Sequence, residues 1–445
     1  MRGSAVFRTG VAPGGALAGP WVRDPLWTRA RAVPSLDLRF ADNKSLVDAV
    51  TGASLVTFTR ASSGTFVGSD GLIQTAATNE PRFDHNPTTG ESLGLLVEEA
   101  RTNSITNNTM VGAVAGTPGT LPTGWNRNVT QNGITQNVAG VGVINGISYV
   151  DIRFQGTATG SGYTDVAMGS ATAAQNQTWA FSAYLAMVGG STANITSGGL
   201  TLYGSPTFSD NGSVIWLSTI GSNLTANSRF SAVRTFTNVL TNSANFRLTI
   251  SATAGAAVDI TLRIGLPQLE QGAFATSVIP TTSATVTRAA DVASIGSSAF
   301  TSFYNQSEGT MFVDFLRAYS GNFPNFPNLY QFNDGTNDNE ITVFGIQGGQ
   351  LFQPSVIIGA SSQVNFVTFA SIFPGPNRCA HSLSLNNSVF AGNGVLTTPD
   401  TSVNLPTVNQ VKFGERGGQR FTGHYKRICF WRQALPGATL QAITG

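Results

Sequence analysis

Short runs in which apolar and polar residues alternate recur along most of this chain, and such runs are typical of half-buried β-strands. They are clearest at residues 36–40, 149–154, 179–185, 246–250 and 310–316. Asn-Gly and Asp-Gly pairs, which readily form tight hairpin turns, separate such runs at residues 70–71, 132–133, 145–146 and 211–212. No repeat with a period of roughly 20–50 residues runs through the chain, so a solenoid or propeller is not expected. The pattern predicts an all-β protein.

The spacing of these runs divides the 445 residues into four regions. Residues 1–35 show no alternation, and residues 36–108 form a β-rich connecting region. Residues 109–285 contain enough short, evenly spaced strands for a β-sandwich, and a linker rich in Pro, Thr and Ser closes this region at 280–285. Residues 286–445 carry the strands of a second sandwich. The predicted fold is therefore an N-terminal extended arm followed by two β-sandwich (jelly-roll) domains.

The first region combines glycine and proline with aromatic and arginine side chains, namely Trp21, Arg23, Trp27, Arg29 and Arg31. Tryptophan and arginine are enriched in protein interfaces. We therefore expect an arm that docks on another subunit and that the rest of the chain does not need for folding. The alternative is an arm that folds back on its own chain.

Composition narrows the classes of protein further. Only 11% of the residues are charged and 41% are hydrophobic, which favours packed strands over disorder. The net charge is +2, and no basic run with interleaved aromatic residues indicates nucleic-acid binding. No apolar run reaches the length of about 18 residues that a membrane span needs, and Arg8 and Pro13 interrupt any signal peptide. We expect assembly in a cytoplasm, without membrane insertion.

The residue types that usually carry catalysis form no recognisable constellation. Cys379 and Cys429 are too few for a disulfide framework and are expected to be buried, with a single bridge as the alternative. His85, His381 and His424 lack the spacing of a zinc site. Nucleophile-elbow, Walker and dinucleotide motifs are absent. We expect no catalytic residues and no cofactor, so the protein is not expected to be an enzyme.

Two sets of short segments resemble tail and virion structural proteins of bacteriophages and related prophages. The first set is FTRAS at 58–62, SDGLI at 69–73, NEPRFD at 79–84 and GLLVEEARTN at 94–103. The second set is PQLE at 267–270, TSVIPTT at 276–282 and VTRAAD at 286–291. The two sets bracket the middle sandwich. This resemblance implies a location in the virion, and it does not say in which part.

The last part of the chain, roughly residues 300–445, resembles the closing strands of concanavalin A-like (laminin-G-like) lectin and glucanase domains. The resemblance lies in a strand that ends at Gly414, a strand at 423–431 and a short final helix at 439–443. It implies that Ile428 and Phe430 face the core and that Cys429 and Trp431 lie on the opposite face. In the middle sandwich, the segment 265–270 resembles the last strand of a carbohydrate-binding-module-like jelly roll.

The densest acidic cluster, at 333–340, contains Asp334, Asp338 and Glu340. Hydrolases of the lectin-like class usually carry a Glu-x-Asp-x-x-Glu strand, which is absent here, although glycoside hydrolysis needs a pair of carboxylates. The Asn- and Gly-rich spacing predicts a solvated turn. A weak calcium site at these three residues is the alternative, because Ca²⁺ takes carboxylate, amide and backbone oxygens.

Sugar-binding sites combine aromatic faces with amide and charged side chains. The candidates in the second sandwich are Tyr319, Tyr330, Asn333, Asp334 and Trp431. Trp125, Tyr163 and Tyr203 are further aromatic candidates near loops. For each of these aromatic residues a place in the core or at a subunit interface is the competing interpretation.

Together these observations predict a virion structural protein, in the role of a fibre, spike or capsid-decoration subunit that adheres to host-surface polysaccharide. The expected partners are other virion proteins and further copies of the chain, with a trimer favoured, because few charges guard the strands. A purely structural subunit without a ligand is one alternative, and a polysaccharide depolymerase is another.

Overall fold

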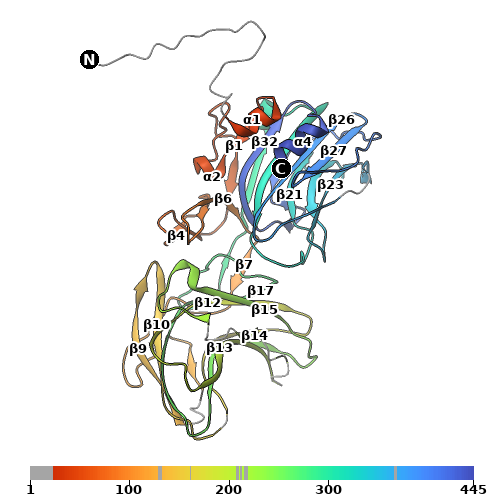
Figure 1. The fold of residues 1–445 in the computed structure, drawn as a ribbon. Helices are drawn as coiled ribbons and strands as arrows, with labels where there is room; N and C mark the ends of the chain where they lie inside the picture. The colour runs from red at the N-terminus through yellow and green to blue at the C-terminus, as the bar shows by residue number, and fades with distance from the viewer. Residues whose placement is uncertain are drawn as a thin grey trace, which may run out of the picture. The chain divides into compact units, whose positions relative to one another are not determined.

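The computed structural model (Figure 1) describes residues 24–128, 133–160, 162–206, 210, 213–214, 219–364 and 368–445. The chain is mostly β, as the alternation predicted. The described residues divide into two compact units: the first contains residues 24–57, 293–421 and 425–445, and the second lies within 58–292 and 422–424. The second unit is thus an insertion in the sequence of the first. No helix in the described part of the chain is long and apolar enough to cross a membrane.

Two antiparallel sheets form the first unit. In one sheet the neighbouring strands are, in order, β28 (Val395–Leu396), β27 (Asn387–Gly392), β26 (Pro376–Ser384), β20 (Glu308–Arg317) and β32 (Gly423–Trp431), and β1 (Leu36–Leu38) pairs with β32 beside this path. The other has the order β19 (Val292–Gly296), β29 (Gln410–Phe413), β21 (Asn328–Asn333), β22 (Glu340–Gly345), β23 (Leu351–Ile358) and β24 (Ser361–Ser362), with β25 (Phe369–Ala370) beside β23. A small hairpin pairs β30 (Glu415–Arg416) with β31 (Gln419–Arg420).

Aromatic side chains fill the space between these two sheets. The ring of Phe430 in β32 lies 5.8 Å from that of Phe332 in β21, and Phe315 in β20 lies 5.3 Å from Phe352 in β23. Phe303, at the end of α3 (Ser297–Phe303), packs edge-on against Phe430. These contacts between facing strands make the unit a β-sandwich.

The outer face of the first sheet is also buried, because helices cover it. Ile428 and Phe430 face the space between the sheets, whereas Cys429 and Trp431 pack in a cluster with α1 (Pro25–Ala30) and α4 (Gly437–Thr444). The opposite faces inferred for these residue pairs are therefore confirmed. The two helices lie side by side (Figure 1). Cys379 and Cys429 are both buried and form no disulfide with each other, as expected from their small number.

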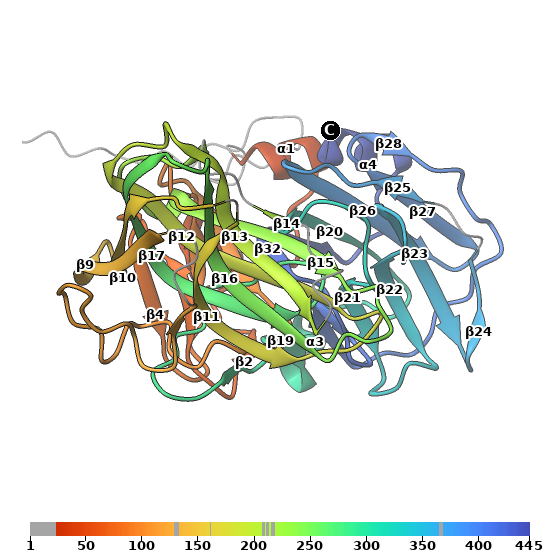
Figure 2. The ribbon, with the colours of Figure 1, turned by 90° about the horizontal axis from the view of Figure 1, so that it is seen from below.

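The second unit contains a sandwich of two five-stranded sheets. One has the order β15 (Arg229–Thr235), β12 (Thr178–Gly190), β17 (Ala257–Gln271), β10 (Ile147–Thr157) and β9 (Ile134–Ile144). The other has the order β14 (Ser213–Val214), β13 (Ile195–Ser205), β16 (Ser243–Ala252), β11 (Thr164–Thr172) and β8 (Asn126–Arg127). The ring of Phe181 in β12 lies 5.3 Å from that of Phe246 in β16, which places the core between the sheets. Figures 1 and 2 show β9 at one edge of its sheet.

Smaller elements complete the second unit. They are the hairpin of β3 (Gly64–Val67) with β4 (Ile73–Ala76), the pair β5 (Phe83–His85) and β6 (Ser92–Val97), the pair β7 (Arg101–Asn103) and β18 (Val286–Arg288), and the 3-10 helix η4 (Ala226–Ser228). The short strand β2 (Thr57–Thr59) contains the boundary between the two units. Because β7 precedes the sandwich in sequence and β18 follows it, their pairing brings the entry and exit of the sandwich together.

Three local expectations differ from the structure. The alternation at 36–40 continues as strand only to Leu38, and α2 (Phe40–Asn43) begins at Phe40. β1, expected in the connecting region, belongs to the first unit. Thr281, expected in a linker, is buried, and its backbone N–H donates to Asn108 Oδ1 at 2.7 Å. Hydrogen bonds with Asn108, which is 173 positions earlier in the chain, explain why this segment packs although its composition is typical of a linker.

Candidate functional site

The aromatic residues predicted to bind carbohydrate in the first unit lie in its core. Tyr330 and Trp431 are each 1% exposed, and Trp431 Nε1 donates to the carbonyl oxygen of Ala32 at 3.0 Å. Tyr319 is buried as well, with the guanidinium of Arg317 5.4 Å from its ring centre. A sugar stacks on an accessible ring face. These three side chains therefore offer no such face in the folded unit.

Asn333 and Asp334 stabilise a turn. Asn333 Oδ1 accepts from the backbone N–H of Gly335 at 3.0 Å. Asp334 Oδ1 accepts from the backbone N–H and the hydroxyl of Thr336, at 2.9 and 2.6 Å. The hydrogen bond from the Thr336 hydroxyl is the main cause that lowers the pKa of Asp334, with a further contribution from Asn339. The segment 333–340 thus contains the turn that its spacing predicted.

The carboxylates of the alternative calcium site are not arranged around one point. Glu340 is buried, and its Oε1 lies 2.6 Å from Nη2 of Arg416. Asp334 Oδ2 instead accepts from Asn339 Nδ2 at 2.8 Å. Among the described residues, including Asp338, no group of three or more His, Cys, Asp or Glu side chains could hold a metal ion.

The predicted docking residues that the structure describes contact their own chain. Trp27 is buried, and its Nε1 donates to Asp37 Oδ2 at 3.1 Å. Arg29 Nη1 donates to the carbonyl oxygen of Ala442 at 3.1 Å, and Arg31 adopts the left-handed conformation that ends α1. Residues 24–31 thus fold back on the first unit, which was the alternative interpretation of the arm. Trp21 and Arg23 lie outside the described residues.

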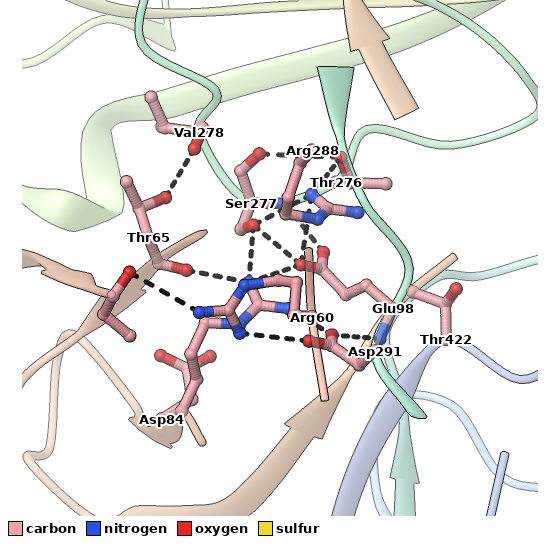
Figure 3. Close-up of polar contacts among 12 residues, drawn as sticks. Arg60, Thr65, Asp84, Glu98, Thr276, Ser277, Val278, Arg288, Asp291 and Thr422 are labelled. Atoms are coloured by element: carbon pink, nitrogen blue, oxygen red, sulfur yellow. Dashed lines mark hydrogen bonds and ion pairs between the residues drawn. The ribbon is translucent and has the colours of Figure 1, made fainter. Parts of the chain in front are cut away.

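The densest polar cluster of the second unit draws on both sets of segments that resemble virion proteins (Figure 3). Arg82 Nη1 donates to Glu98 Oε2 at 2.7 Å, and Arg82 Nη2 pairs with Asp291. Arg60 Nη1 lies 3.1 Å from Asp291 Oδ1, and Arg288 Nη1 lies 3.2 Å from Glu98 Oε2. All five side chains are buried. We call Arg60, Arg82, Glu98, Arg288 and Asp291 the buried ion cluster.

This cluster holds three guanidinium groups and two carboxylates, so backbone carbonyl oxygens take the surplus donors. Arg60 Nη2 donates to the carbonyl oxygen of Ala77 at 2.7 Å, and Arg82 Nη1 donates to that of Thr65 at 2.9 Å. A guanidinium has five N–H donors and accepts nothing. The backbone carbonyl dipoles therefore help to stabilise the extra positive charge.

Glu98 is occupied on both oxygens and remains ionised. Ser277 donates to it from its backbone N–H at 2.8 Å and from its hydroxyl at 2.7 Å. Burial raises the pKa of Glu98, but the charges of Arg288 and Arg82 outweigh that effect and hold the pKa well below its usual range. A carboxylate that stays ionised cannot act as a general acid. The cluster is a structural tie between segments that enter and leave the second unit.

A different surface of the second unit combines an exposed ring with polar groups. Phe246 and Leu248 of β16 face the core, so Arg247 between them points to the outer face of its sheet. Arg247 Nη1 lies 2.9 Å from Asp165 Oδ2 in the neighbouring strand β11. The Arg247 guanidinium is 4.8 Å from the ring centre of Tyr203 in β13.

Two more side chains complete this surface. Asn128 Nδ2 donates to Asp165 Oδ1. Tyr163 is 42% exposed, directly precedes β11, and lies close enough to Tyr203 to affect the pKa of that residue. We call Asn128, Tyr163, Asp165, Tyr203 and Arg247 the Tyr163 face. Of these residues the sequence analysis named only the two tyrosines; the alternation in 243–252 could have placed Arg247 outward, but only the strand register shows its pairing with Asp165.

Burial changes the acid–base properties of this face. It raises the pKa of Tyr203 to about 12, so the phenol keeps its proton at neutral pH. Burial also raises the pKa of Asp165, against the opposing effect of Arg247. The accessible groups of this face are therefore the ring of Tyr163 and the partly exposed side chains of Arg247 and Asn128, because Tyr203 and Asp165 are buried. The ring can stack on a ligand rich in hydroxyl groups, and the guanidinium and amide can hydrogen-bond to it.

The first unit has a pocket of about 100 Å³ beside β27. Its lining is Pro354, Val364, Ser388, Phe390, Thr397, Thr398, Pro399 and Asp400. Ser388 Oγ lies 3.0 Å from His381 Nε2, so this hydroxyl is already engaged. Phe390 is buried and presents no open ring face. We call this the β27 pocket, and a small polar group could bind there.

Comparison with known proteins finds no matching family model and no similar curated protein. Over about a third of its length the chain is similar in structure to lectin-like β-sandwich domains. A CBM40 domain of the Ruminococcus gnavus IT-sialidase, solved with alpha2,3 sialyllactose, is 17% identical, with 32% of this chain and 84% of that chain covered and a TM-score of 0.27. Similarity at this level does not identify a ligand.

Two other solved structures are similar to the same extent. The leech intramolecular trans-sialidase is 16% identical, with 32% of this chain and 24% of that chain covered and a TM-score of 0.27. The heptameric SAP-like pentraxin from Limulus polyphemus is 10% identical, with 31% and 70% covered and a TM-score of 0.25.

Proposed function

We propose that this protein is a structural subunit of a bacteriophage virion, in the role of a fibre, spike or capsid-decoration subunit, and that it adheres to host-surface polysaccharide. The observation that carries the ligand is the Tyr163 face, where a 42% exposed ring lies two residues before Asp165, the ion-pair partner of Arg247. The place in a virion is supported by the resemblance of the segments at 58–103 and 267–291, whose charged residues form the buried ion cluster.

The charge balance of the Tyr163 face favours a neutral, hydroxyl-rich ligand. Asp165 compensates the charge of Arg247, so a strongly anionic ligand would find no unpaired cation there. Sugar rings present C–H groups to an aromatic face and hydroxyls to amide and charged side chains. Binding at one such shallow site is expected to be weak, with a millimolar Kd or about 4 kcal/mol. Several copies on one particle would raise the avidity by about 10²–10⁴.

An array of bacterial capsular and lipopolysaccharide O-antigen polysaccharides, probed with the full-length chain clustered on beads, tests the ligand. Tyr163→Ala should weaken binding to the best polysaccharide at least about tenfold, which corresponds to 1.4 kcal/mol. Phe326→Ala is the matched control, because Phe326 is an exposed ring of the first unit. Loss of binding in Phe326→Ala or in Thr398→Val, but not in Tyr163→Ala, would move the site to the first unit, where the sequence analysis expected it.

The competing functions predict different results in the same experiments. A purely structural subunit would bind no polysaccharide in clustered form, and the burial of Tyr330 and Trp431 favours this alternative for the first unit. A depolymerase would release new reducing ends from the polysaccharide during incubation. Gold-labelled antibody against the chain should decorate purified phage particles, and particles that carry no label would contradict the virion assignment.

A further inference from the structure

The edge strand β9 ends in a tight hairpin that defines which of its backbone groups point outward. Asn145 and Gly146 connect β9 to β10 and have φ values of 54° and 77°, as a two-residue type I′ turn requires. Ile144 and Ile147, which flank the turn, are register partners. In such a hairpin the flanking residues form a hydrogen-bonded pair, and hydrogen-bonded pairs then alternate with non-hydrogen-bonded pairs.

From this alternation, Gly142 and Gly140 bond to β10, whereas the N–H and C=O groups of Val141 and Val143 point away from it. Farther along β9, Gly116 and Pro118 cover the outer edge: Val138 donates to the carbonyl oxygen of Pro118, and Gly116 donates to that of Val138, both at 2.9 Å. Between residues 139 and 144, no described residue forms a backbone hydrogen bond to this edge.

The side chains of this edge are apolar and accessible. Val143 is 68% exposed and Val141 is 39% exposed. The segment 139–144 reads AGVGVI, without a charged residue or proline. Natural edge strands are normally guarded by lysine, proline or a covering element, because unpaired backbone groups otherwise recruit another strand. This stretch has none of these protections on the residues themselves.

We propose that residues 139–144 form a docking surface for the same residues of a second copy of this chain, paired antiparallel. A two-fold axis at Gly142 would place Val141 of each copy opposite Val143 of the other. The outward N–H and C=O groups of both valines then meet their partners, which gives four backbone hydrogen bonds. The valines of the two copies cover one another, and the two glycines on the axis bring no side chain that could obstruct the approach.

A second copy fits this edge better than an unrelated peptide, because the arrangement of outward groups is self-complementary. The outward residues lie symmetrically around Gly142, so one rotation satisfies both copies, as an isologous interface requires. The contact produces a dimer, in contrast to the trimer expected from the sequence. This inference does not depend on the proposed function, since it concerns backbone pairing alone.

Val143→Pro tests the contact, because proline removes only an N–H that β10 does not use and is tolerated at strand edges. Val143→Ala is the matched control, since it keeps the N–H. In sedimentation velocity of the full chain at about 50 µM, the wild type and Val143→Ala should be dimers, and Val143→Pro should raise the Kd at least about tenfold. Circular dichroism should show the same fold in all three proteins.

Val143→Lys is a second variant that keeps the backbone unchanged and adds a guarding charge. It should weaken the dimer in the same way, and it tests the contact even if the Val143→Pro variant fails to fold. A wild type that is monomeric at this concentration would overturn the proposal. So would an oligomer that both Val143→Pro and Val143→Lys leave intact.

Discussion

Both units join segments that are far apart in sequence through arginine–carboxylate clusters, but the two clusters differ in exposure. In the second unit, Arg60 and Asp291 are completely buried. In the first unit, Asp37 binds Arg427 at 2.8 and 2.7 Å, and Arg39 and Asp24 extend the cluster toward solvent. We call Asp24, Asp37, Arg39 and Arg427 the α1 cluster, because Asp24 also caps α1.

The difference shows what each cluster contributes. The α1 cluster has two charges of each sign, and water reaches both arginines and Asp24, although Asp37 is buried. Removal of one member therefore leaves most of the others partly solvated. The buried ion cluster has no such access, so each of its members depends on the others. Breaking a fully buried pair costs several kcal/mol because a charge remains without a partner, whereas exposed pairs contribute little.

The largest effect is expected for Arg82→Ala in the buried ion cluster. The substitution leaves Glu98 and Asp291 without a shared cation and should reduce the stability of the second unit by about 3–5 kcal/mol. Hydrogen exchange of peptides from β17 should accelerate strongly, and peptides from β20 in the first unit serve as the internal control. Unchanged exchange in β17 would show that the cluster does not hold this unit together.

A smaller effect is expected for Trp27→Ala, which tests the fold-back of the chain onto the first unit. Trp27 packs in one cluster with Trp431 and Leu440, so its truncation should cost about 3 kcal/mol through lost burial and a cavity. Urea unfolding measures the loss. A variant that lacks residues 1–23 keeps Trp27 and is the control, and it should unfold at the wild-type urea concentration. If Trp27→Ala also unfolds at the wild-type urea concentration, the N-terminal arm is dispensable for folding, as the sequence analysis expected.

As the pH is lowered, the first unit should lose stability at a higher pH than the buried ion cluster of the second unit. Burial lowers the pKa of His381 to about 3, so the folded state keeps this histidine neutral while the unfolded state, with a pKa of about 6.5, takes up a proton. The histidine's contribution is lost as pH falls below that unfolded pKa. Between pH 7 and 5 it should amount to about 2 kcal/mol.

His381→Gln should remove this part of the pH dependence, as urea unfolding at the two pH values will show. An equal loss in the variant and the wild type would contradict the assignment. Glu98 has the same sign of pH dependence in a lower window: its lowered pKa stabilises the fold above the unfolded value of about 4.3, and that contribution is lost as pH falls below this value.

The smallest effect is expected for Arg153→Ala. Arg153 pairs with Asp259 at 2.8 Å on the solvent side of the sandwich, with 42% and 53% of the two side chains exposed. Because water replaces such a pair readily, thermal unfolding should be unchanged. A loss as large as that of Arg82→Ala would mean that exposure does not explain the difference between the clusters.

Local patterns predicted the fold better than the site. Alternation and the resemblance of the last strands placed Ile428 and Phe430 on one face of β32 and Cys429 and Trp431 on the other, because strand periodicity is a local property. The burial of Trp431 was not predicted. Its face is buried by α1, which comes from the other end of the chain, and no local pattern contains that contact.

The same limit explains the charged residues. Arg60 and Asp291 belong to segments that resemble virion proteins, but they are 231 positions apart in the sequence. The sequence alone does not show which charged residues form ion pairs over such a separation. Asp165 and Arg247 are 82 positions apart and pair only through the register of β11 with β16. The sequence therefore predicted single residues of the Tyr163 face, but it did not predict that they lie together.

The insertion of the second unit has a consequence for synthesis on the ribosome. Asp37 and its partner Arg427 are 390 positions apart, and β1 pairs with β32, the last strand of the chain. At about 5–20 residues per second, some 20–80 s pass between the appearance of these two residues. Apart from residues 422–424, the second unit is complete in sequence well before that time. Nascent chains should therefore carry a folded second unit while the strands of the first still wait for their partners, and chaperones that shield exposed β-edges would act in this interval.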